Sequence, residues 1–135
     1  MDDTIKRVFY RQSKSSRRKH MNGLGVDIVR ISRFGNLILE SKKYRKILSD
    51  PETEIFERLT KPERRMEFLA GRFAAKEAIF KALSKTGENF TFPEISVLGD
   101  ATGALEVTFA RETKLRVLVS ISHSEENAVA VAVLN

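Results

Sequence analysis

The spacing of hydrophobic residues changes along the chain and predicts a strand, then helices, then further strands. Small and apolar residues alternate over 23–28, which predicts a short strand. Over 30–48 the apolar residues recur at close to 3.6-residue intervals with basic residues between them, so we expect a helix with a basic side. Residues 49–52, Ser-Asp-Pro-Glu, are typical of a helix start and predict a second, short helix over about 53–59.

A longer helix is predicted to follow. Thr60 is an N-cap candidate, Pro62 suits the first turn, and Glu63 stands three residues past Thr60, as in a capping box. Only Gly71 interrupts the pattern before about Leu83. Because glycine inside a helix costs about 1 kcal/mol relative to alanine, we expect Gly71 to permit a close approach of another element.

The last third of the chain alternates with a period of two residues, which predicts two hairpins. Their strands are 92–98 with 105–109 around a turn at 99–103, and 116–122 with 128–134 around a turn at 123–127. This order of elements indicates an α+β fold in which the helices pack on one face of a mainly antiparallel sheet. We expect a single domain over residues 21–135.

The composition narrows the class of protein. A chain of 135 residues that is 41% hydrophobic has enough apolar residues for one globular core. The absence of cysteine excludes a disulfide framework, a thiolate metal site and a cysteine nucleophile. No apolar run approaches the roughly 18–20 residues of a membrane-spanning helix, and no secretory signal is evident. We therefore expect a soluble, cytoplasmic protein with no membrane partner.

The net charge of +6 is concentrated at the N-terminus. Residues 1–20 carry seven basic and two acidic side chains, whereas the remaining 115 residues carry 17 and 16 and are nearly neutral. The first 20 residues contain few large apolar side chains, so we expect a disordered or extraneous extension. Met21, immediately before the first predicted strand, favours this interpretation. The alternatives are a nucleic-acid-binding arm and a patch attracted to anionic membranes.

Two regions offer candidate ligands for a metal ion and for phosphate. Asp27 follows the small residues of the first strand and could bind a hard cation, or could simply cap the next helix. In the long predicted helix, Arg72 and Lys76 are four residues apart and share a face, as do Glu77 and Lys81. Such an edge suits a polyphosphate with its metal; a solvated face with one Glu–Lys pair is the alternative.

A histidine completes the candidate chemistry. His123 stands at the end of a predicted strand and could contact a phosphate or carry a proton, or could be a hydrogen-bonded turn residue. A Ser–His–Asp hydrolase is disfavoured, because Ser122 and His123 are adjacent on a strand and point to opposite faces. With Asp27, Glu77 and the nearby cations, the set suits a magnesium-dependent reaction on a diphosphate.

Three strings of residues resemble one known family. They are GLGVDI at 23–28, FLAGRFAAKEA at 68–78 with Lys81 just after it, and SISH at 120–123. Together, in this order and spacing, they resemble the holo-acyl-carrier-protein synthases, which are small bacterial 4′-phosphopantetheinyl transferases. The resemblance implies transfer of phosphopantetheine from coenzyme A to a serine of apo acyl carrier protein, in fatty acid biosynthesis. It also implies release of adenosine 3′,5′-bisphosphate, a magnesium cofactor, and a homotrimer with sites at the subunit interfaces.

The resemblance also implies roles for individual residues. Asp27 and Glu77 match the metal-binding carboxylates, and both are catalytic candidates together with Lys81. Glu77 is the candidate that takes the proton of the serine hydroxyl. Coenzyme A would be bound by Arg72, Lys81, His123 and Ser124.

An acidic carrier protein would be attracted to the basic side of the first predicted helix. There the resemblance and the charge pattern point to three basic residues and two apolar ones that we expect to be exposed. The carrier-binding candidates are Arg30, Arg33, Leu37, Lys43 and Tyr44.

Two other functions stay open on the sequence. A nucleic-acid-binding module would use the basic extension, but the nearly neutral charge of 21–135 counts against it, and we expect no nucleic-acid partner. A different magnesium-dependent enzyme, such as a hydrolase of coenzyme A, would use water as the acceptor in place of a carrier protein.

Overall fold

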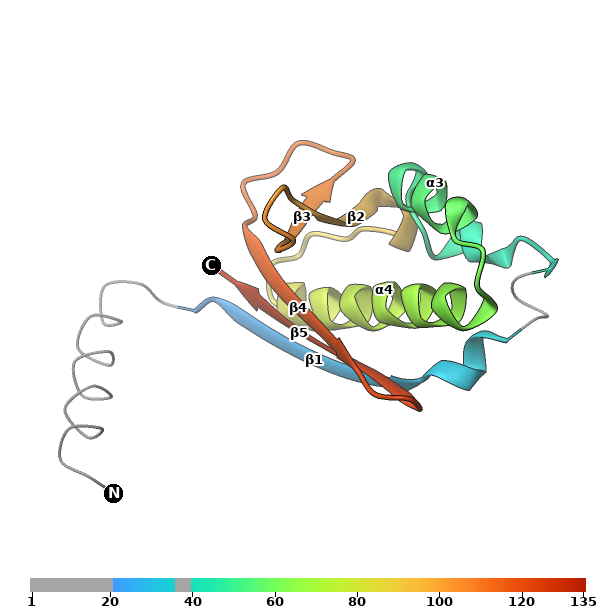
Figure 1. Cartoon of the computed structure of the whole chain (residues 1–135). Helices are drawn as coiled ribbons and strands as arrows, with labels where there is room; N and C mark the ends of the chain where they lie inside the picture. The colour runs from blue at the N-terminus through green and yellow to red at the C-terminus, as the bar shows by residue number, and fades with distance from the viewer. Residues whose placement is uncertain (1–20, 36–39) are drawn as a thin grey trace, which may run out of the picture.

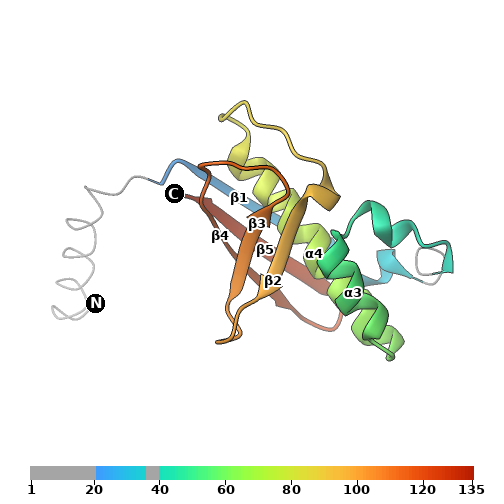
Figure 2. The ribbon, with the colours of Figure 1, turned by 90° about the horizontal axis from the view of Figure 1, so that it is seen from above.

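The computed structural model describes residues 21–35 and 40–135. A long helix, α4 (Pro62–Leu83), lies between two antiparallel sheets (Figures 1 and 2). The larger sheet has the strand order β1 (Gly23–Arg30), β5 (Asn127–Leu134), β4 (Val117–His123). The smaller sheet is the hairpin of β2 (Ile95–Gly99) and β3 (Leu105–Phe109). The α+β class and both predicted hairpins are confirmed, and the hairpin on the second side of α4 corrects the expectation of a single sheet.

The strands of the larger sheet align in rows that face α4. Asp27 on β1 is opposite Ala130 on β5, which is opposite Ile121 on β4. Ala130 is buried, and a Cβ atom placed on Gly71 of α4 would stand 3.2 Å from Cγ2 of Ile121. Gly71 therefore permits the close approach that the sequence predicted.

Helix α4 approaches β1 even more closely. A Cβ atom on Gly23 would stand 1.9 Å from the carbonyl oxygen of Ala82, and one on Gly25 would stand 1.8 Å from that of Ala78. Real Cβ atoms do not make contacts this short, so only glycine fits at these two positions with this spacing. Because the two contacts are one helical turn apart on α4 and two residues apart on β1, they fix the position of the strand along the helix.

The start of α4 differs from the prediction. Lys61 is the N-cap residue and makes no side-chain capping bond, so the predicted capping box of Thr60 and Glu63 is wrong. Pro62 does occupy the first turn. A backbone N–H in the first turn has no acceptor within the helix, so the N–H that proline lacks costs no hydrogen bond there. The helix ends at Leu83, as predicted.

A capping box does occur at the preceding helix, α3 (Asp50–Arg58). Ser49 is its N-cap: the Ser49 hydroxyl accepts a hydrogen bond from Glu52 N at 3.4 Å, and Glu52 Oε1 accepts one from Ser49 N at 2.8 Å. The predicted short helix is therefore confirmed, although it begins three residues earlier than expected.

The single helix predicted over 30–48 is wrong for the described residues. Two short 3₁₀ helices, η1 (Ile31–Phe34) and η2 (Lys43–Lys46), stand there instead. Gly35 has an extended backbone and Lys42 has a left-handed one with a φ of 56°, and neither conformation continues a helix. The apolar periodicity reflects burial of separate turns and not one helical stripe. A third 3₁₀ helix, η3 (Phe92–Glu94), precedes β2.

Among the described residues, none of the helices has the length and apolar character needed to cross a membrane. The predicted extension over 1–20 lies outside the described residues.

We predict that Gly25→Ala lowers the free energy of unfolding by about 3 kcal/mol, because its Cβ would force β1 away from α4. Gly99→Ala is the matched control, since no heavy atom lies within 4 Å of its added Cβ, and it should change stability by less than about 0.5 kcal/mol. Urea denaturation of both variants measures the difference. Equal stabilities would contradict the close packing of β1 on α4.

Candidate functional site

Asp27 and Lys81 meet where β1 crosses the last turns of α4. Asp27 points to the same side of β1 as Gly23 and Gly25, and therefore toward the helix. The ammonium of Lys81 donates to the carbonyl oxygen of Val26 at 2.8 Å and lies 3.4 Å from Oδ1 of Asp27. The Asp27 side chain is 18% exposed and that of Lys81 is 54% exposed, so the pair stands at the edge of solvent.

One carboxylate oxygen of Asp27 has no partner within the described part of the protein. Oδ2 is buried and accepts no hydrogen bond there. A buried charged oxygen without a partner is costly, and folded proteins rarely keep one unless a ligand, a water or an ion satisfies it. Asp27 Oδ2 is therefore a candidate ligand for a hard cation.

Glu77 lies close to this position on α4. It precedes Lys81 by one helical turn and lies on the same face of the helix. Gly25 packs against Ala78, so Asp27, the next residue of β1 that faces the helix, lies about one turn closer to the start of α4. This places Asp27 at about the level of Ala74. Because side chains on a helix lean toward its N-terminus, the Glu77 carboxylate extends toward the same level. Within residues 21–35 and 40–135, the side chain of Glu77 forms no hydrogen bond or ion pair, and its carboxylate is available to a ligand.

The donor set is small. The described residues contain no group of three or more His, Asp or Glu side chains that could hold a metal ion. Mg²⁺ is often bound through only one or two carboxylates, with water and substrate phosphates as its other ligands. Asp27 and Glu77 therefore fit a magnesium ion that a phosphate substrate helps to bind.

A hollow of about 320 Å³ opens beside Lys81, at the end of α4. Lys85, one turn further along the chain, adds a second cation to its wall; the sequence spacing of these two lysines could have predicted this. The hollow is lined by Met21, Asn22, Gly23, Leu24, Lys81, Ala82, Ser84 and Lys85.

Arg72 lies on the other side of α4. It is nine residues before Lys81, and at about 100° per residue this puts the two side chains on opposite faces. Its Nε donates to the carbonyl oxygen of Val97 at 3.1 Å, and its guanidinium carbon stands 4.2 Å from the centre of the Phe68 ring. Burial lowers the pKa of Arg72 below its usual value, and the attraction of Glu52 partly counters this effect.

His123 and Ser124 are also separated from Asp27 within one chain. His123, at the end of β4, is 44% exposed, and its Nε2 lies 3.8 Å from a carboxylate oxygen of Glu67. Ser124 lies in the β4–β5 turn, where its hydroxyl accepts a hydrogen bond from Asn127 N at 3.2 Å. Ten residues of α4, about 15 Å, separate Glu67 from Glu77. The candidate residues for coenzyme A thus occupy separate places on one chain.

The sequence analysis missed a row of packed aromatic rings beside Glu77. The ring centres of Phe34 and Phe73 are 5.3 Å apart, those of Phe73 and Phe92 are 5.3 Å apart, and those of Phe92 and Phe80 are 5.0 Å apart. We call these four residues the aromatic row. Phe73 precedes Glu77 by one turn of α4 and Phe80 follows it by nearly one turn, and both are only partly buried. The sequence alone could not show that Phe34 and Phe92 pack against Phe73 and Phe80.

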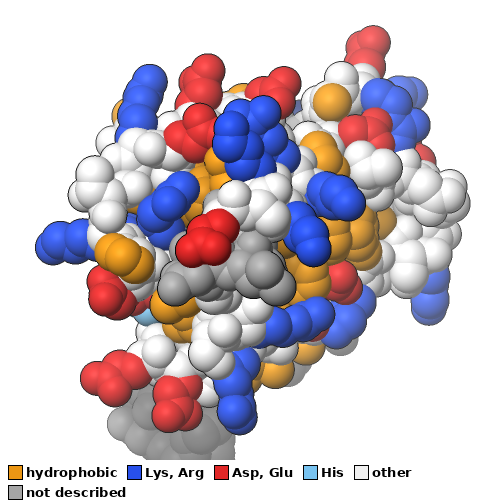
Figure 3. Space-filling model, turned by 90° about the vertical axis from the view of Figure 1, so that its right-hand side faces the viewer, with side chains coloured by type: hydrophobic (Ala, Val, Ile, Leu, Met, Phe, Trp, Pro, Cys, Tyr) orange, Lys and Arg blue, Asp and Glu red, His pale blue; other side chains and the backbone are white. Residues whose placement is uncertain are grey.

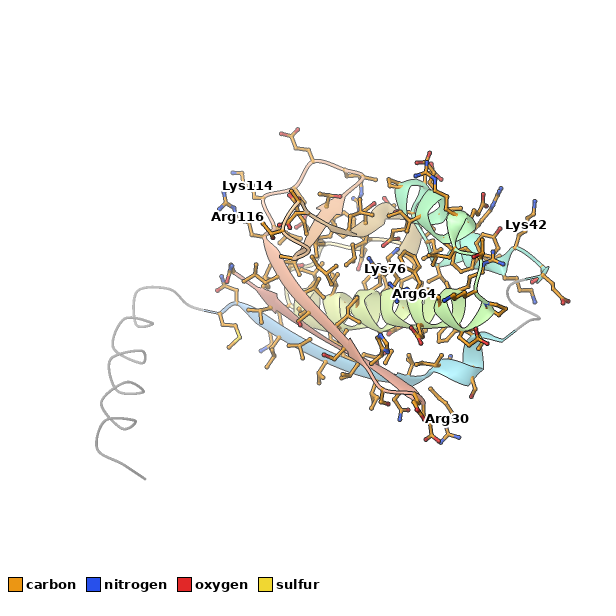
Figure 4. All side chains as sticks on the ribbon, viewed as in Figure 1. Arg30, Lys42, Arg64, Lys76, Lys114 and Arg116 are labelled. Carbon is orange, nitrogen blue, oxygen red and sulfur yellow. The ribbon has the colours of Figure 1, made fainter. Side chains whose placement is uncertain are left out.

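Basic side chains surround one end of the aromatic row. The guanidinium carbon of Arg33 stands 5.2 Å from the ring centre of Phe73, and Arg30 and Lys43 are exposed. Figure 3 shows several Lys and Arg side chains around an apolar area at this end of the molecule, and Figure 4 shows Arg30 and Lys42 there. The predicted basic surface is therefore present, although the single helix expected to carry it is not.

Three expectations for individual residues need comment. Tyr44 is only 4% exposed, its hydroxyl donates to Glu57 at 3.1 Å and its ring packs on Phe56, so its expected exposure to a partner is wrong. Lys76 is not on a phosphate-facing or solvated edge, because it is completely buried and forms an ion pair with Glu52. Leu37 lies outside the described residues.

Comparisons with known proteins identify relatives of this chain. Residues 23–133 match a family model described as the 4′-phosphopantetheinyl transferase superfamily. A holo-[acyl-carrier-protein] synthase of Geobacillus sp. (strain WCH70) is 40% identical over 114 residues, which cover 83% of this chain and 94% of the relative.

Solved structures of similar proteins agree. A holo-(acyl-carrier-protein) synthase from Bacillus anthracis in complex with coenzyme A (3′,5′-ADP) has a TM-score of 0.72 and 38% identity, and covers 84% of this chain and 96% of its own. The Helicobacter pylori holo-[acyl-carrier-protein] synthase in complex with coenzyme A has a TM-score of 0.68 and 28% identity, and covers 83% and 99%.

The unpartnered carboxylate oxygen gives a prediction for Asp27→Asn. Because Oδ2 is buried without a partner and Lys81 keeps its bond to the Val26 carbonyl, removing the charge should leave the free energy of unfolding unchanged or raise it slightly. Thermal and urea denaturation in metal-free buffer measure this. A loss of more than about 2 kcal/mol would show that the Asp27 carboxylate stabilises the fold and would contradict its assignment as a ligand-binding group.

Proposed function

The chain belongs to the 4′-phosphopantetheinyl transferase superfamily, among the holo-[acyl-carrier-protein] synthases, and we propose its reaction on this basis. We propose that it transfers 4′-phosphopantetheine from coenzyme A to a serine of apo acyl carrier protein, in fatty acid biosynthesis. Mg²⁺ is the proposed cofactor. The observation that carries the proposal is the meeting of β1 and α4. There Asp27, with an unpartnered buried oxygen, stands beside Lys81, and the Glu77 carboxylate extends toward the level of Asp27. A cytoplasmic location stays a prediction from the sequence.

Coenzyme A is the proposed donor. Relatives from B. anthracis and H. pylori have been solved in complex with it. On this chain, Lys81 and Lys85 beside the hollow at the end of α4 offer two cations to a diphosphate. Arg72 lies on the opposite face of α4 from Lys81, and His123 and Ser124 lie at the far end of β4, so we propose that they contact coenzyme A bound to a neighbouring subunit.

Asp27 and Glu77 are the residues that would hold the magnesium ion. The buried Oδ2 of Asp27 and the free carboxylate of Glu77 supply the anionic oxygens that Mg²⁺ prefers. When bound, the ion neutralises charge on the diphosphate and polarises its phosphorus–oxygen bonds. Lys81 is held by the Val26 carbonyl and Asp27 and presents the remaining positive charge to the same phosphates.

The transfer follows from these positions. The carrier serine oxygen attacks the β-phosphorus of coenzyme A, and Glu77 accepts the hydroxyl proton on a carboxylate oxygen. A new oxygen–phosphorus bond forms to the serine as the bond between the β-phosphorus and the bridging oxygen breaks. Adenosine 3′,5′-bisphosphate leaves with the electron pair of that bond, and Lys81 stabilises the charge that develops on it.

The carrier protein would approach along the aromatic row. Phe73, Glu77 and Lys81 lie at successive turns of one face of α4, over about 12 Å, and Arg33 stands over Phe73 at the start of this line. The basic residues would attract an acidic carrier, and the partly exposed rings would contact its apolar residues. This surface directs the carrier serine toward Glu77.

A homotrimer would complete the site. Among the described elements, none packs on the outer face of the larger sheet (Figure 1), which exposes five large apolar side chains. They are Leu24, Val26, Ile28, Leu118 and Val131, with exposed fractions from 40% to 66%. Such a face favours burial against other copies of the chain.

Light scattering should give three times the 15.3 kDa mass of the chain, and a monomer at micromolar concentration would contradict this assembly.

We predict that the full chain, incubated with coenzyme A, Mg²⁺ and an apo acyl carrier protein, adds one phosphopantetheine group to the carrier, as mass spectrometry will detect. Removal of the metal with EDTA should abolish the transfer, and added Mg²⁺ should restore it. Release of adenosine 3′,5′-bisphosphate without a change in carrier mass would indicate a hydrolase and contradict the proposal.

Variants of the metal ligands test the residue assignments. Asp27→Ala and Glu77→Ala should each lower kcat at least about 100-fold with the fold retained, because water cannot replace a carboxylate ligand in position and charge. Glu106→Ala, which removes an exposed carboxylate on β3, is the control and should keep wild-type activity. Near-wild-type turnover by either site variant would reject the role of that residue.

The carrier surface gives a separate prediction. Arg33→Ala should raise KM for the carrier about tenfold with a smaller change in kcat, and the salt dependence of KM should weaken. Arg116→Ala removes the same charge at the opposite end of the molecule (Figure 4) and should change KM less than twofold. Equal effects of the two substitutions would show that only the total charge matters.

A further inference from the structure

The proposed reaction does not use a pair of oppositely charged residues that is completely buried against α4. The side chains of Lys76 and Glu52 are each 0% exposed, and Figure 4 shows Lys76 in the interior, on the side of α4 that faces α3. The Lys76 ammonium donates to Glu52 Oε1 at 2.5 Å and to the carbonyl oxygens of Ile47 and Phe92 at 2.7 and 2.9 Å. Each of its three protons therefore has an acceptor.

Glu52 extends these contacts to the start of its own helix and to β2. Its Oε1 also accepts from the backbone N–H of Ser49, and its Oε2 accepts from that of Val97, both at 2.8 Å. The two side chains and their five hydrogen bonds, which we call the Lys76–Glu52 network, thus connect α4 to the end of η2, to α3, to η3 and to β2.

Stability alone does not explain why charges occupy this place. A buried ion pair costs so much desolvation that apolar residues of the same volume are often as stabilising or more so. Such a pair does favour one arrangement of the surrounding segments, because its hydrogen bonds are all satisfied only in that arrangement.

Specific contacts are needed to fix the rotation of α4 about its own axis. Leu69, Ala70 and Ala75 point to three different sides of the helix, and each is 0% exposed. A helix that is buried on several sides has no single apolar stripe to determine its rotation about its own axis. Lys76 supplies that constraint, since its ammonium can reach its three acceptors at one rotation only.

The rotation of α4 determines where Glu77 points. Lys76 and Glu77 are adjacent and about 100° apart around the helix, so one is directed to α3 and β2 while the other is directed to the β1 side. A rotation of about 20° would move a side-chain end roughly 5–6 Å from the helix axis by about 2 Å, enough to misplace a metal ligand.

We propose that the Lys76–Glu52 network is a positioning device that fixes the rotation of α4 and thereby places the Glu77 carboxylate beside Asp27. Lys76 and Glu52 are positioning residues, because neither contacts the substrate or the metal. This inference rests on the proposed function, since it gives Glu77 its role as a magnesium ligand.

The test uses Lys76→Met combined with Glu52→Gln. This pair of substitutions removes both charges and keeps side-chain volume, and the amide of the second substitution keeps an oxygen for a backbone N–H. Calorimetry measures coenzyme A affinity with and without Mg²⁺. Wild type should bind coenzyme A more tightly with Mg²⁺ than without it. Without Mg²⁺, the double variant should bind coenzyme A as tightly as wild type does. With Mg²⁺, its affinity for coenzyme A should be at least tenfold lower than that of wild type. The Mg²⁺ concentration for half-maximal transfer should rise at least tenfold, with KM for the carrier within twofold of wild type.

The control removes buried contacts elsewhere on α4. Ile79 is 0% exposed, and either Ile79→Val or Ile79→Ala is chosen to match the melting temperature of the double variant. The control should keep the magnesium-dependent gain in affinity. Loss of the gain in both proteins would show that any destabilisation has this effect and would overturn the positioning role.

Each remaining outcome is also decisive. An unchanged magnesium dependence in the double variant overturns the inference and leaves the proposed function standing. A wild-type protein with no magnesium effect on coenzyme A binding or transfer contradicts the proposed function itself. If the double variant does not fold, Glu52→Gln alone is measured and should show a smaller shift in the same direction. Failure of both to fold overturns the inference, because the network would then be required by the whole fold.

Discussion

The contact between β1 and α4 determines where the candidate catalytic residues lie. Gly23 and Gly25 let the strand backbone rest directly on the carbonyl oxygens of Ala82 and Ala78, at a separation that no side chain allows. This contact fixes the level of Asp27 along the helix and brings it to Lys81. The charges of the site therefore depend on the absence of two side chains, and a larger residue at either glycine would separate the strand that carries Asp27 from the helix that carries Glu77 and Lys81.

The two sides of α4 have different polar chemistry. On the α3 side, Lys76 and Glu52 are buried with all their hydrogen-bonding atoms satisfied, as expected of charges that determine structure. On the β1 side, within the described residues, Asp27 keeps a buried oxygen without a partner and Glu77 has a free carboxylate, as expected of groups kept for a ligand. Removing charged groups from water costs free energy on both sides of α4. Only on the β1 side would the binding of a ligand offset this cost.

Local pattern predicted most of the fold, because period-two alternation and a long helical segment are properties of the sequence itself. It failed over 30–48, where backbone conformations at Gly35 and Lys42 end the helical turns although the apolar spacing continues. Asp27, Glu77 and Lys81 became candidates from their places at a strand end and on one helix face, and the family resemblance then implied their roles. The structure brings these residues to one side of α4. The burial of Lys76 could not be predicted, because its partner Glu52 lies on another helix, 24 residues away. The aromatic row was missed for the same reason, since Phe34 and Phe92 reach α4 from the separate 3₁₀ helices η1 and η3.

The central claim is that Asp27 and Glu77 bind one divalent ion next to the diphosphate of coenzyme A. Crystals of the protein grown with coenzyme A and Mn²⁺ test it most directly, because anomalous scattering locates the metal independently of the surrounding density. We predict one manganese peak within coordination distance of carboxylate oxygens from both residues, including Oδ2 of Asp27. A peak that contacts only one of the two carboxylates, or that lies elsewhere on the protein, would contradict the account.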